Sequence, residues 1–331
     1  MRAATTPARA SGGGPAFVAL GGGHGLSASL SALRLMSDRI TAVVTVADDG
    51  GSSGRLRDEL GVLPPGDLRM ALTALCDDSD WGRTWRDVLQ HRFSSSGDLD
   101  QHAVGNLLIV ALWELLGDQV EGLDWVGRLL GARGRVLPMC DVPLSIEADV
   151  RHPDGSMTSV RGQTSVAGTS DRIEQVRLIP RDPPACADAV AAIDAADWVV
   201  LGPGSWYTSV LPHLLVPELR EALHRTRART IVTLNVAPEQ DSETVGMRAE
   251  DHLEVLHAHA PDLPIHAVLA DPAAVEDVGV LADRCKSVGA RLLLRQVRRG
   301  DGSAQHDPLR LAAALRDVVE ETWGDVGRRR P

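Results

Sequence analysis

Apolar and polar stretches alternate along the chain in a pattern that predicts strands and helices in turn. Short apolar runs at 16–20 and 40–46 are typical of buried strands, and residues 26–36 between them repeat large apolar side chains at helical spacing. This order of strand, helix and strand is a βαβ unit. The alternation resumes in the second half of the chain, where strands are predicted at 197–201, 230–235, 265–270 and 291–297.

Helices are predicted between these later strands as well. They cover 187–196, a stretch near 209–224, a stretch near 249–259, and 307–323. The last helix has Asp307 in the N-cap position and Pro308 at the first helical position, a typical helix start. Together these elements predict an α/β fold with a Rossmann-like, doubly wound parallel sheet.

Two stretches interrupt the alternation. Helices at 67–75, 85–93 and 104–116, the last one ended by Gly117, predict a helical insertion over about 64–133. Two β-like segments flank a turn that contains Asp154 and Gly155, which predicts a β-hairpin excursion over about 136–180.

The ends of the chain have a different composition from the rest. Residues 1–14 hold almost no large apolar side chain, so we expect a disordered tail there and a single domain over 15–325. The tail lacks the apolar core of a signal peptide, and the chain has no apolar run long enough to span a bilayer. We therefore expect a cytoplasmic protein without membrane insertion.

Charge and cysteine content exclude several classes of function. The 331 residues carry a net charge of −11, whereas nucleic-acid binders are basic, so no nucleic-acid partner is expected. The four cysteines are far apart and form no C-x-x-C pair, which disfavours both a zinc site and a disulfide framework. A small anionic ligand remains compatible with this composition if positive groups gather locally.

Small and polar residues follow four of the predicted strands. The carboxyl ends of parallel strands meet at one edge of a sheet, where ligands of such folds bind. The residues concerned are Gly21, Gly22, Gly23, His24, Gly25 and Leu26 after the first strand; Asp48, Asp49, Gly50, Gly51, Ser52, Ser53 and Arg55 after the second; Gly202, Pro203, Gly204 and Ser205 after the strand at 197–201; and Asn235 after the next. Their convergence predicts a nucleotide- or phosphate-binding edge.

The glycines of the first loop let backbone N–H groups approach an anion at the positive end of the helix that follows. The residues at 50–54 are interpreted as a second anion-binding loop, with Arg55 making a bidentate contact to phosphate. Asn106 lies in an otherwise apolar helix, so its amide either bonds helix to loop or contacts the ligand.

Three acidic residues are candidate metal ligands. Asp48 and Asp49 would repel an anion beside them unless a Mg²⁺ ion lay between, or a ribose hydroxyl, which would offset the repulsion more weakly. The alternative is that both are solvated turn residues that bind no ligand. Asp67 precedes a predicted helix, where it acts as an N-cap alone or as a cap that also binds the metal.

Two other enzyme classes match parts of the same motifs. Gly23, Gly25 and Ala28 fit G-x-G-x-x-A, with Asp48 placed 23 residues after Gly25, so a nicotinamide-dependent oxidoreductase is an alternative. The dinucleotide fingerprint does not explain the Gly-Ser-rich tract and the arginine that follow Asp49 in the sequence. Ser52 matches G-x-S-x-G, but it lies six residues beyond Val46 and no Ser-His-Asp order is evident, so a hydrolase is disfavoured.

Five tracts together resemble the YvcK-like gluconeogenesis factor family, which belongs to the CofD-like (UPF0052) proteins. They are "GGGHGLSASL", "VTVADDGGSSGRLRDELGVLPPGDLR", "HAVGNLLIVAL", "LGPGSWYTSVLPHLLVPEL" and "NVAPEQDSETVGMRAEDHLEVL". The resemblance implies a cytoplasmic binder of a nucleotide sugar such as UDP-N-acetylglucosamine, with no established catalytic activity. It also implies roles in growth on gluconeogenic carbon sources, in cell shape and in cell-wall synthesis.

The CofD branch of this group is enzymatic, and it is the main alternative. Its members transfer 2-phospholactate from a nucleotide-activated donor to a deazaflavin with Mg²⁺. Their glycine loop and acidic tract match Gly21–Gly25 and Asp48–Asp49, and their downstream metal aspartate matches Asp67. This chain departs from the family pattern at His24, where a threonine is usual, and at Gln305, where an arginine is usual.

We therefore expect a nucleotide-binding regulator with no catalytic residue and with Mg²⁺ as its candidate cofactor. A second copy of the chain and proteins of cell-wall synthesis are its candidate partners.

Overall fold

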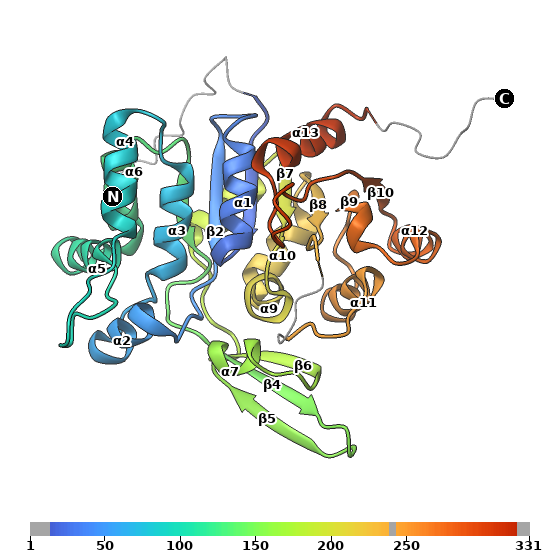
Figure 1. Cartoon of the computed structure of the whole chain (residues 1–331), viewed down its shortest axis with the longest axis horizontal. Coiled ribbons are helices and arrows are strands. Elements are labelled where there is room, and N and C mark those ends of the chain that lie inside the picture. Colours follow the sequence, from blue (N-terminus) through green and yellow to red (C-terminus); the bar gives the residue numbers. More distant parts are fainter. Residues whose placement is uncertain (1–13, 238–242, 323–331) are drawn as a thin grey trace.

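Seven parallel strands form the central sheet, in the order β10-β9-β8-β7-β1-β2-β3 (Figure 1). The computed structural model describes residues 14–237 and 243–322; most of the predicted tail, Trp323 and residues 238–242 of the fifth family tract lie outside it. The strands are β1 Phe17–Gly21, β2 Ile40–Val44, β3 Arg135–Pro138, β7 Trp198–Leu201, β8 Arg229–Thr233, β9 Ala267–Ala270 and β10 Arg291–Leu294.

The strand order reverses at β1, because β2 and β3 extend the sheet on one side and β7 to β10 extend it on the other. Every residue of β1, β7 and β9 is buried, as expected for parallel strands that are covered on both faces. The predicted α/β fold with a doubly wound parallel sheet is confirmed.

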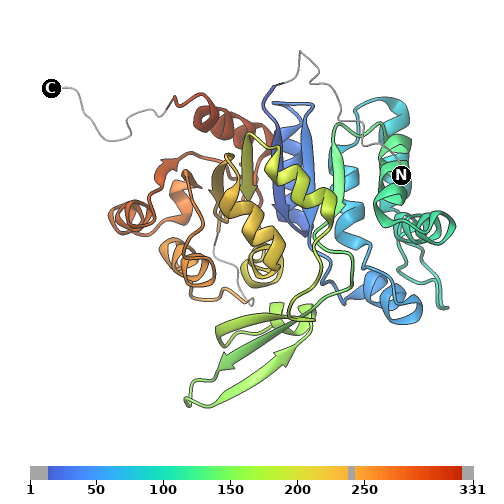
Figure 2. The ribbon, with the colours of Figure 1, turned by 180° about the vertical axis from the view of Figure 1, so that it is seen from behind.

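Helices cover both faces of the sheet. One face carries α1 (Gly23–Leu33), which packs between α3 (Gly66–Leu75) and α13 (Pro308–Val319) (Figure 1). The other face carries α8 (Ala187–Asp194) and α10 (Pro217–Arg225) (Figure 2). The remaining helical segments are α2 Gly51–Leu60, α4 Asp80–Gln90, α5 Val104–Leu116, α6 Gln119–Leu130, α7 Gln163–Ala167, α9 Pro212–Leu215, α11 Ala249–His259, α12 Val278–Ser287, a π-helical turn η1 Trp206–Val210 and a 3₁₀ turn η2 Pro272–Ala274.

A small antiparallel sheet projects from the carboxyl edge of the main sheet (Figures 1 and 2). It consists of β4 (Ser145–Arg151), β5 (Met157–Arg161) and β6 (Arg172–Ile179), in the order β5-β4-β6. Burial alternates residue by residue along β4, so one face of this sheet packs inward and the other faces solvent. The predicted hairpin is confirmed, and Gly155 occupies its turn with φ of +85°.

Two predictions about chain segments are wrong. Residues 51–54, expected to be part of a loop, form the first turn of helix α2, because the Gly54 N–H donates to the Gly50 carbonyl and begins the helix. The strand Arg135–Pro138, expected within the antiparallel excursion, pairs in parallel with β2 and ends the main sheet. The excursion therefore begins at Ser145.

The helix expected near 209–224 is divided into η1, α9 and α10. Pro212 and Pro217 each occupy the first position of a new segment, where the missing N–H is not needed. The predicted start of the last helix is confirmed, because the Asp307 carboxylate accepts hydrogen bonds from the N–H groups of Leu309 and Arg310.

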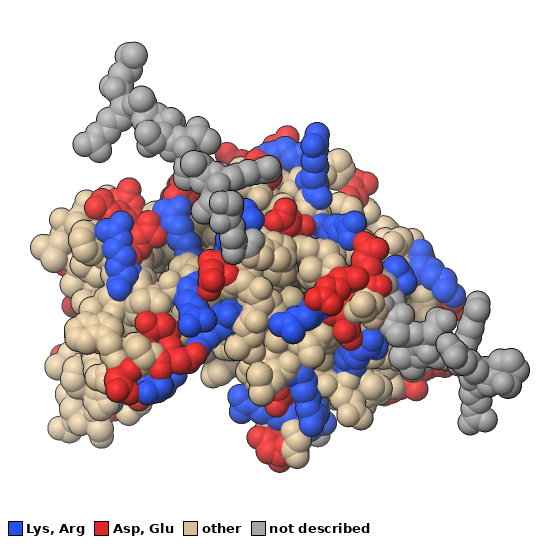
Figure 3. Space-filling view, turned by 90° about the horizontal axis from the view of Figure 1, so that it is seen from above, with Lys and Arg blue, Asp and Glu red and all other residues tan. Residues whose placement is uncertain are grey.

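Charged side chains of both signs mix on the surface. Figure 3 views the molecule from the side on which the strands begin, and acidic and basic residues are interspersed over the described part of this face. No helix among residues 14–237 and 243–322 is long and apolar enough to cross a membrane.

Candidate functional site

The four loops predicted to converge follow β1, β2, β7 and β8, which are neighbours in the sheet. They meet at the carboxyl edge, and the point where the strand order reverses lies between β1 and β7. Open α/β sheets bind ligands in the crevice at this point. The arrangement of the loops therefore supports the predicted location of the site.

The loops after β1 and β7 touch through their backbones. A Cβ atom on Gly25 would overlap the Pro203 carbonyl, so only glycine fits there. Asn235, at the end of β8, holds the same loop: its Oδ1 accepts from the Gly204 N–H at 2.9 Å, and its Nδ2 donates to the Gly204 carbonyl at 3.1 Å. The amide of Asn235 is thus engaged in positioning the loop after β7.

A pocket of about 270 Å³ opens beside this contact. No aspartate or glutamate is among the residues that line it, although the chain as a whole is strongly acidic. The lining residues are His24, Gly25, Ser27, Ala28, Ser31, Gly204, Asn235, Val236, Ala237, Arg299, Ala304, Gln305, His306 and Pro308. His24 and Gln305, the two departures from the family pattern, therefore lie in one pocket.

Sequence reasoning missed Arg299, which brings a positive charge to this pocket. The turn at 300–303 folds the chain back, so that the Arg299 N–H donates to the Gln305 carbonyl at 2.9 Å. The Asp-Gly pair in this turn was the available signal for the reversal. Arg299 thus places a positive charge in the same pocket as Gln305.

A buried carboxyl group lies on the other side of the glycine loop. A Cβ atom on Gly22 would lie 2.5 Å from Asp67 Oδ2 and 2.5 Å from Thr45 Cγ2, so this glycine allows the loop to approach both residues. The Gly23 N–H donates a hydrogen bond to the Asp67 carboxylate. The Thr45 hydroxyl is buried without a hydrogen-bond partner among the described residues, and sequence reasoning also missed it.

The prediction that Asp67 is an N-cap is wrong. Pro65 occupies the N-cap position of α3, and Asp67 lies within the first turn with its carboxyl group directed at the glycine loop. Burial, and then the charge of Asp48, raise the pKa of Asp67 to about 7. A nearby cation would favour the ionised form of this group.

Asp48 and Asp49 face different neighbours. Asp48 Oδ1 accepts from the Gly50 N–H at 2.9 Å, and its other oxygen lies near Gly66 at the start of α3. Asp49 Oδ1 instead accepts from the backbone N–H of Thr164 at 2.9 Å and from its hydroxyl at 2.7 Å. Asp48 is thus on the side of Asp67, whereas Asp49 is bonded to α7.

Few side chains near the glycine loop could bind a metal ion. No group of three or more His, Cys, Asp or Glu side chains within residues 14–237 and 243–322 is arranged to hold a metal ion. Mg²⁺ typically takes one or two protein carboxylates and completes its shell with phosphate oxygens and water. Asp48 and Asp67 would supply the two carboxylates of a site of that kind, which a ligand phosphate would have to complete.

The start of α2 is joined to the start of α5. The buried Ser52 hydroxyl accepts from Asn106 Nδ2 at 3.0 Å and from the Ala103 N–H at 3.3 Å, and it lies 3.1 Å from His102 Nδ1. Of the two alternatives for Asn106, the structure describes bonding to a neighbouring element, while Asn106 Oδ1 is buried without a hydrogen-bond partner. With this many partners, Ser52 is a structural link between two helices.

Arg55 donates to the carbonyls of Asp98 and Asp100, in the loop before α5, at 2.9 and 2.6 Å. Ser53 faces Gly66, where a Cβ atom would overlap its hydroxyl. The predicted phosphate contact of Arg55 would require this guanidinium to leave its carbonyl partners.

The other predicted residues support the loops. Gly202 has φ of +73° and Ser205 precedes η1, while Leu26 is buried in the core.

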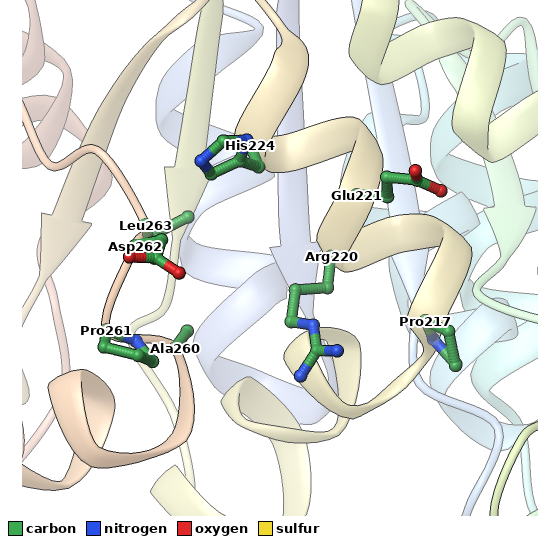
Figure 4. Close-up of a pocket in the computed structure, with 8 residues that line it drawn as sticks. All are labelled: Pro217, Arg220, Glu221, His224, Ala260, Pro261, Asp262 and Leu263. Atoms are coloured by element: carbon green, nitrogen blue, oxygen red, sulfur yellow. The ribbon is translucent and has the colours of Figure 1, made fainter.

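A second, larger pocket lies away from these loops. It measures about 540 Å³ and lies between α10 and the segment after α11 (Figure 4). Arg220 and His224 of α10 lie across from Asp262, and none of the predicted site residues line it. The larger volume of this pocket therefore does not identify it as the predicted binding site.

Comparisons with known proteins identify the family of the chain. The family model described as 2-phospho-L-lactate transferase CofD matches residues 17–321. A "Putative gluconeogenesis factor" from Mycobacterium tuberculosis (strain ATCC 25618 / H37Rv) is 51% identical over 322 residues, covering 95% of this chain and 92% of the relative. The gluconeogenesis factor of Bacillus subtilis (strain 168) is 34% identical, covering 93% of this chain and 99% of the relative.

A solved structure has the same fold. The crystal structure of a UPF0052 family member from Bacillus halodurans superposes with a TM-score of 0.81 at 33% identity, covering 91% of this chain and 99% of that one.

Proposed function

The chain belongs to the 2-phospho-L-lactate transferase CofD family, and from that premise we propose that it is a gluconeogenesis factor that binds a nucleotide sugar. The names of its curated relatives support the first part of this proposal. The ligand is of the UDP-N-acetylglucosamine kind, and the protein acts in the cytoplasm as a regulator of growth on gluconeogenic carbon sources, cell shape and cell-wall synthesis.

One observation carries the proposal: the pocket at the crevice between β1 and β7 is lined without a carboxylate in a chain of net charge −11. Arg299 and the first turn of α1 border this pocket. A helix N-terminus carries about half a positive charge, which favours the phosphates of a nucleotide. The pocket thus combines space for a nucleoside with positive potential for a diphosphate.

The ligand is oriented along the edge of the sheet. Its diphosphate binds at Gly22–Gly25, its nucleoside occupies the pocket with His24 and Gln305, and its sugar points toward Asp48 and Asp67. Asp48 and Asp67 would hold a Mg²⁺ ion together with the ligand phosphates, and its charge would offset the repulsion between carboxylates and phosphates. The proposal assigns no catalytic residue.

Isothermal titration with UDP-N-acetylglucosamine, UDP and GDP, in Mg²⁺ and in EDTA, tests the proposal. UDP-N-acetylglucosamine should bind, and Q305R should tighten binding about tenfold, because a charge-assisted hydrogen bond to phosphate is stronger than a neutral one. Q296R is the matched control, because Gln296 is exposed and does not line the pocket. Absence of nucleotide binding, or equal effects of the two arginines, contradicts the proposal.

A second candidate function is the phospholactate transfer named in the family description. The Asp48–Asp67 pair beside the glycine loop favours it, since Mg²⁺-dependent transfer of this kind needs carboxylates near a phosphate. The test incubates the protein with nucleotide-activated 2-phospholactate, a deazaflavin acceptor and Mg²⁺. We expect no product, and formation of the phospholactyl product would place this candidate first.

A further inference from the structure

We propose that helix α7 of the small antiparallel sheet is a latch across the ligand-binding edge, in which Asp49 and Thr164 act as positioning residues. This role replaces metal binding by Asp49. The part of the inference that concerns ligand affinity rests on the proposed function, whereas the part that concerns the loop after β2 does not.

The first end of the latch is the start of α7. Thr164 donates both its backbone N–H and its hydroxyl to the same oxygen, Asp49 Oδ1, at 2.9 and 2.7 Å. These residues are 115 positions apart in the sequence, so the contact joins the small sheet to the loop after β2. Asp49 is the immediate neighbour of Asp48, which faces the buried Asp67.

The second end of the latch is the end of α7. The Ala167 carbonyl accepts from the Glu243 N–H at 3.1 Å, and Glu243 follows β8 in the sequence. Glu243 Oε1 in turn accepts from the N–H groups of Tyr207 and Thr208, at 2.7 and 3.3 Å. These two residues lie in η1, which follows the loop after β7.

Glycine makes the close approach at the first end feasible. Gly162, just before α7, has φ of +104°, and a Cβ atom there would overlap Asp49 Oδ2. A Cβ atom on Gly50 would lie 3.1 Å from the Thr164 hydroxyl. Both sides of the contact thus use residues without a side chain, one of them in a conformation that glycine adopts readily.

One short helix therefore joins the loop after β2 to Glu243, and through the Glu243 carboxylate to η1, which follows the loop after β7. When the latch is closed, Asp49 cannot turn toward the ligand, and the segment that carries Asp48 and the start of α2 is fixed. The small sheet, which contains α7 between β5 and β6, is consequently coupled to the ligand-binding edge.

Hydrogen–deuterium exchange of the ligand-free protein tests the latch directly. T164V removes the hydroxyl and keeps the backbone N–H, so amides at 49–54 should exchange about threefold faster in this variant. S165A is the matched control, because Ser165 is the exposed neighbour of Thr164 on the same helix. Unchanged exchange at 49–54 in T164V, or equal changes in both variants, overturns the proposal.

Variants of Asp49 separate positioning from metal binding. D49A should weaken binding of UDP-N-acetylglucosamine in Mg²⁺ about tenfold, which corresponds to about 1.4 kcal/mol. D49N retains an oxygen that accepts both bonds from Thr164, so it should restore the affinity and the exchange pattern of the natural chain. If D49N loses as much Mg²⁺-dependent affinity as D49A, Asp49 is a metal ligand and the latch proposal is wrong.

The two proposals fail in different ways. If the natural chain binds none of the nucleotides while T164V still speeds exchange at 49–54, the proposed function is wrong and the latch stands. If the natural chain binds UDP-N-acetylglucosamine and both T164V and D49A bind it equally well, with unchanged exchange, the latch is wrong and the proposed function stands.

Discussion

His213 should make the stability of this protein sensitive to mild acid. It lies in α9 with no exposed surface, and its Nε2 donates to the Val43 carbonyl of β2 at 3.0 Å. Burial lowers its pKa from 6.5 to about 4. The unfolded chain therefore binds a proton at a higher pH than the folded chain, and stability falls as the pH drops from about 6.5 toward 4.

The size of this effect follows from the two pKa values. Between pH 7 and pH 5 the preferential protonation of the unfolded chain at His213 costs about 2 kcal/mol of folding free energy. His306 is also buried, and its pKa is likewise lowered to about 4, so it adds a similar amount. The two histidines together should cost about 4 kcal/mol, a large part of the 5–15 kcal/mol that stabilises a typical domain.

Urea unfolding at pH 7 and pH 5 measures this loss. H213Q keeps a neutral N–H donor for the Val43 carbonyl, so the loss of stability between the two pH values should shrink by about 2 kcal/mol. H257Q is the matched control, because His257 is exposed, and it should leave the loss unchanged. If H213Q loses as much stability in acid as the natural chain does, the assignment of acid sensitivity to His213 is wrong.

Three further substitutions have definite expected outcomes. D67N should raise the melting temperature at pH 8 in EDTA and much less at pH 5. Burial and the charge of Asp48 raise the pKa of this carboxyl to about 7, so the folded state disfavours its ionised form. The gain in folding free energy at pH 8 is at most about 4 kcal/mol. N235A should cost about 1–3 kcal/mol in urea unfolding, because it leaves the Gly204 N–H and carbonyl without their partner. L20A should cost about 2–5 kcal/mol in the same assay, because Leu20 is fully buried in the central strand β1.

The strands and the glycine loops of this fold could be predicted from the sequence, because each gives a local signal. Apolar runs such as 40–46 indicate strands buried on both faces, and the glycines after them indicate tight turns. The carboxyl ends of parallel strands share one edge, so the strand order alone predicts that the four loops converge. The solved relative from Bacillus halodurans has the same architecture.

Helix α2 could not be predicted, because its sequence GSSGRLRDEL combines two glycines and two serines with few apolar residues. Such a segment has low intrinsic helix propensity. Its first turn is held by tertiary contacts instead, above all by the hydrogen bond from Asn106 to Ser52. Strand β3 is only four residues long, and its register beside β2 is set by pairing rather than by any periodic pattern.

The candidate site shows a similar division between local and long-range information. Gly25 and the carboxyl edge were correctly placed together, because both depend on the order of strands and loops. Arg299 was missed because it belongs to no motif and reaches the pocket only through the folded chain. Thr45 lies inside the second family tract, at the end of a predicted apolar strand, and its approach to Gly22 becomes evident only in the folded chain. Asp67 was identified with the wrong local role, because its helix begins two residues earlier than its position suggests.

The double acid at Asp48 and Asp49 illustrates why adjacent residues need not share one ligand. Residues 45–49 belong to no helix or strand, and the two adjacent carboxylates accept hydrogen bonds from different parts of the protein, the Gly50 N–H and Thr164. The two carboxylates are therefore directed apart, one toward Gly66 and Asp67 and the other toward Thr164. A single cation between them would require the chain to turn at this point, which the bonds from Thr164 to Asp49 oppose. Under the two proposals the same pair of residues would serve two purposes: Asp48 would be available to a ligand-bound Mg²⁺ ion, and Asp49 would fix the segment that presents it.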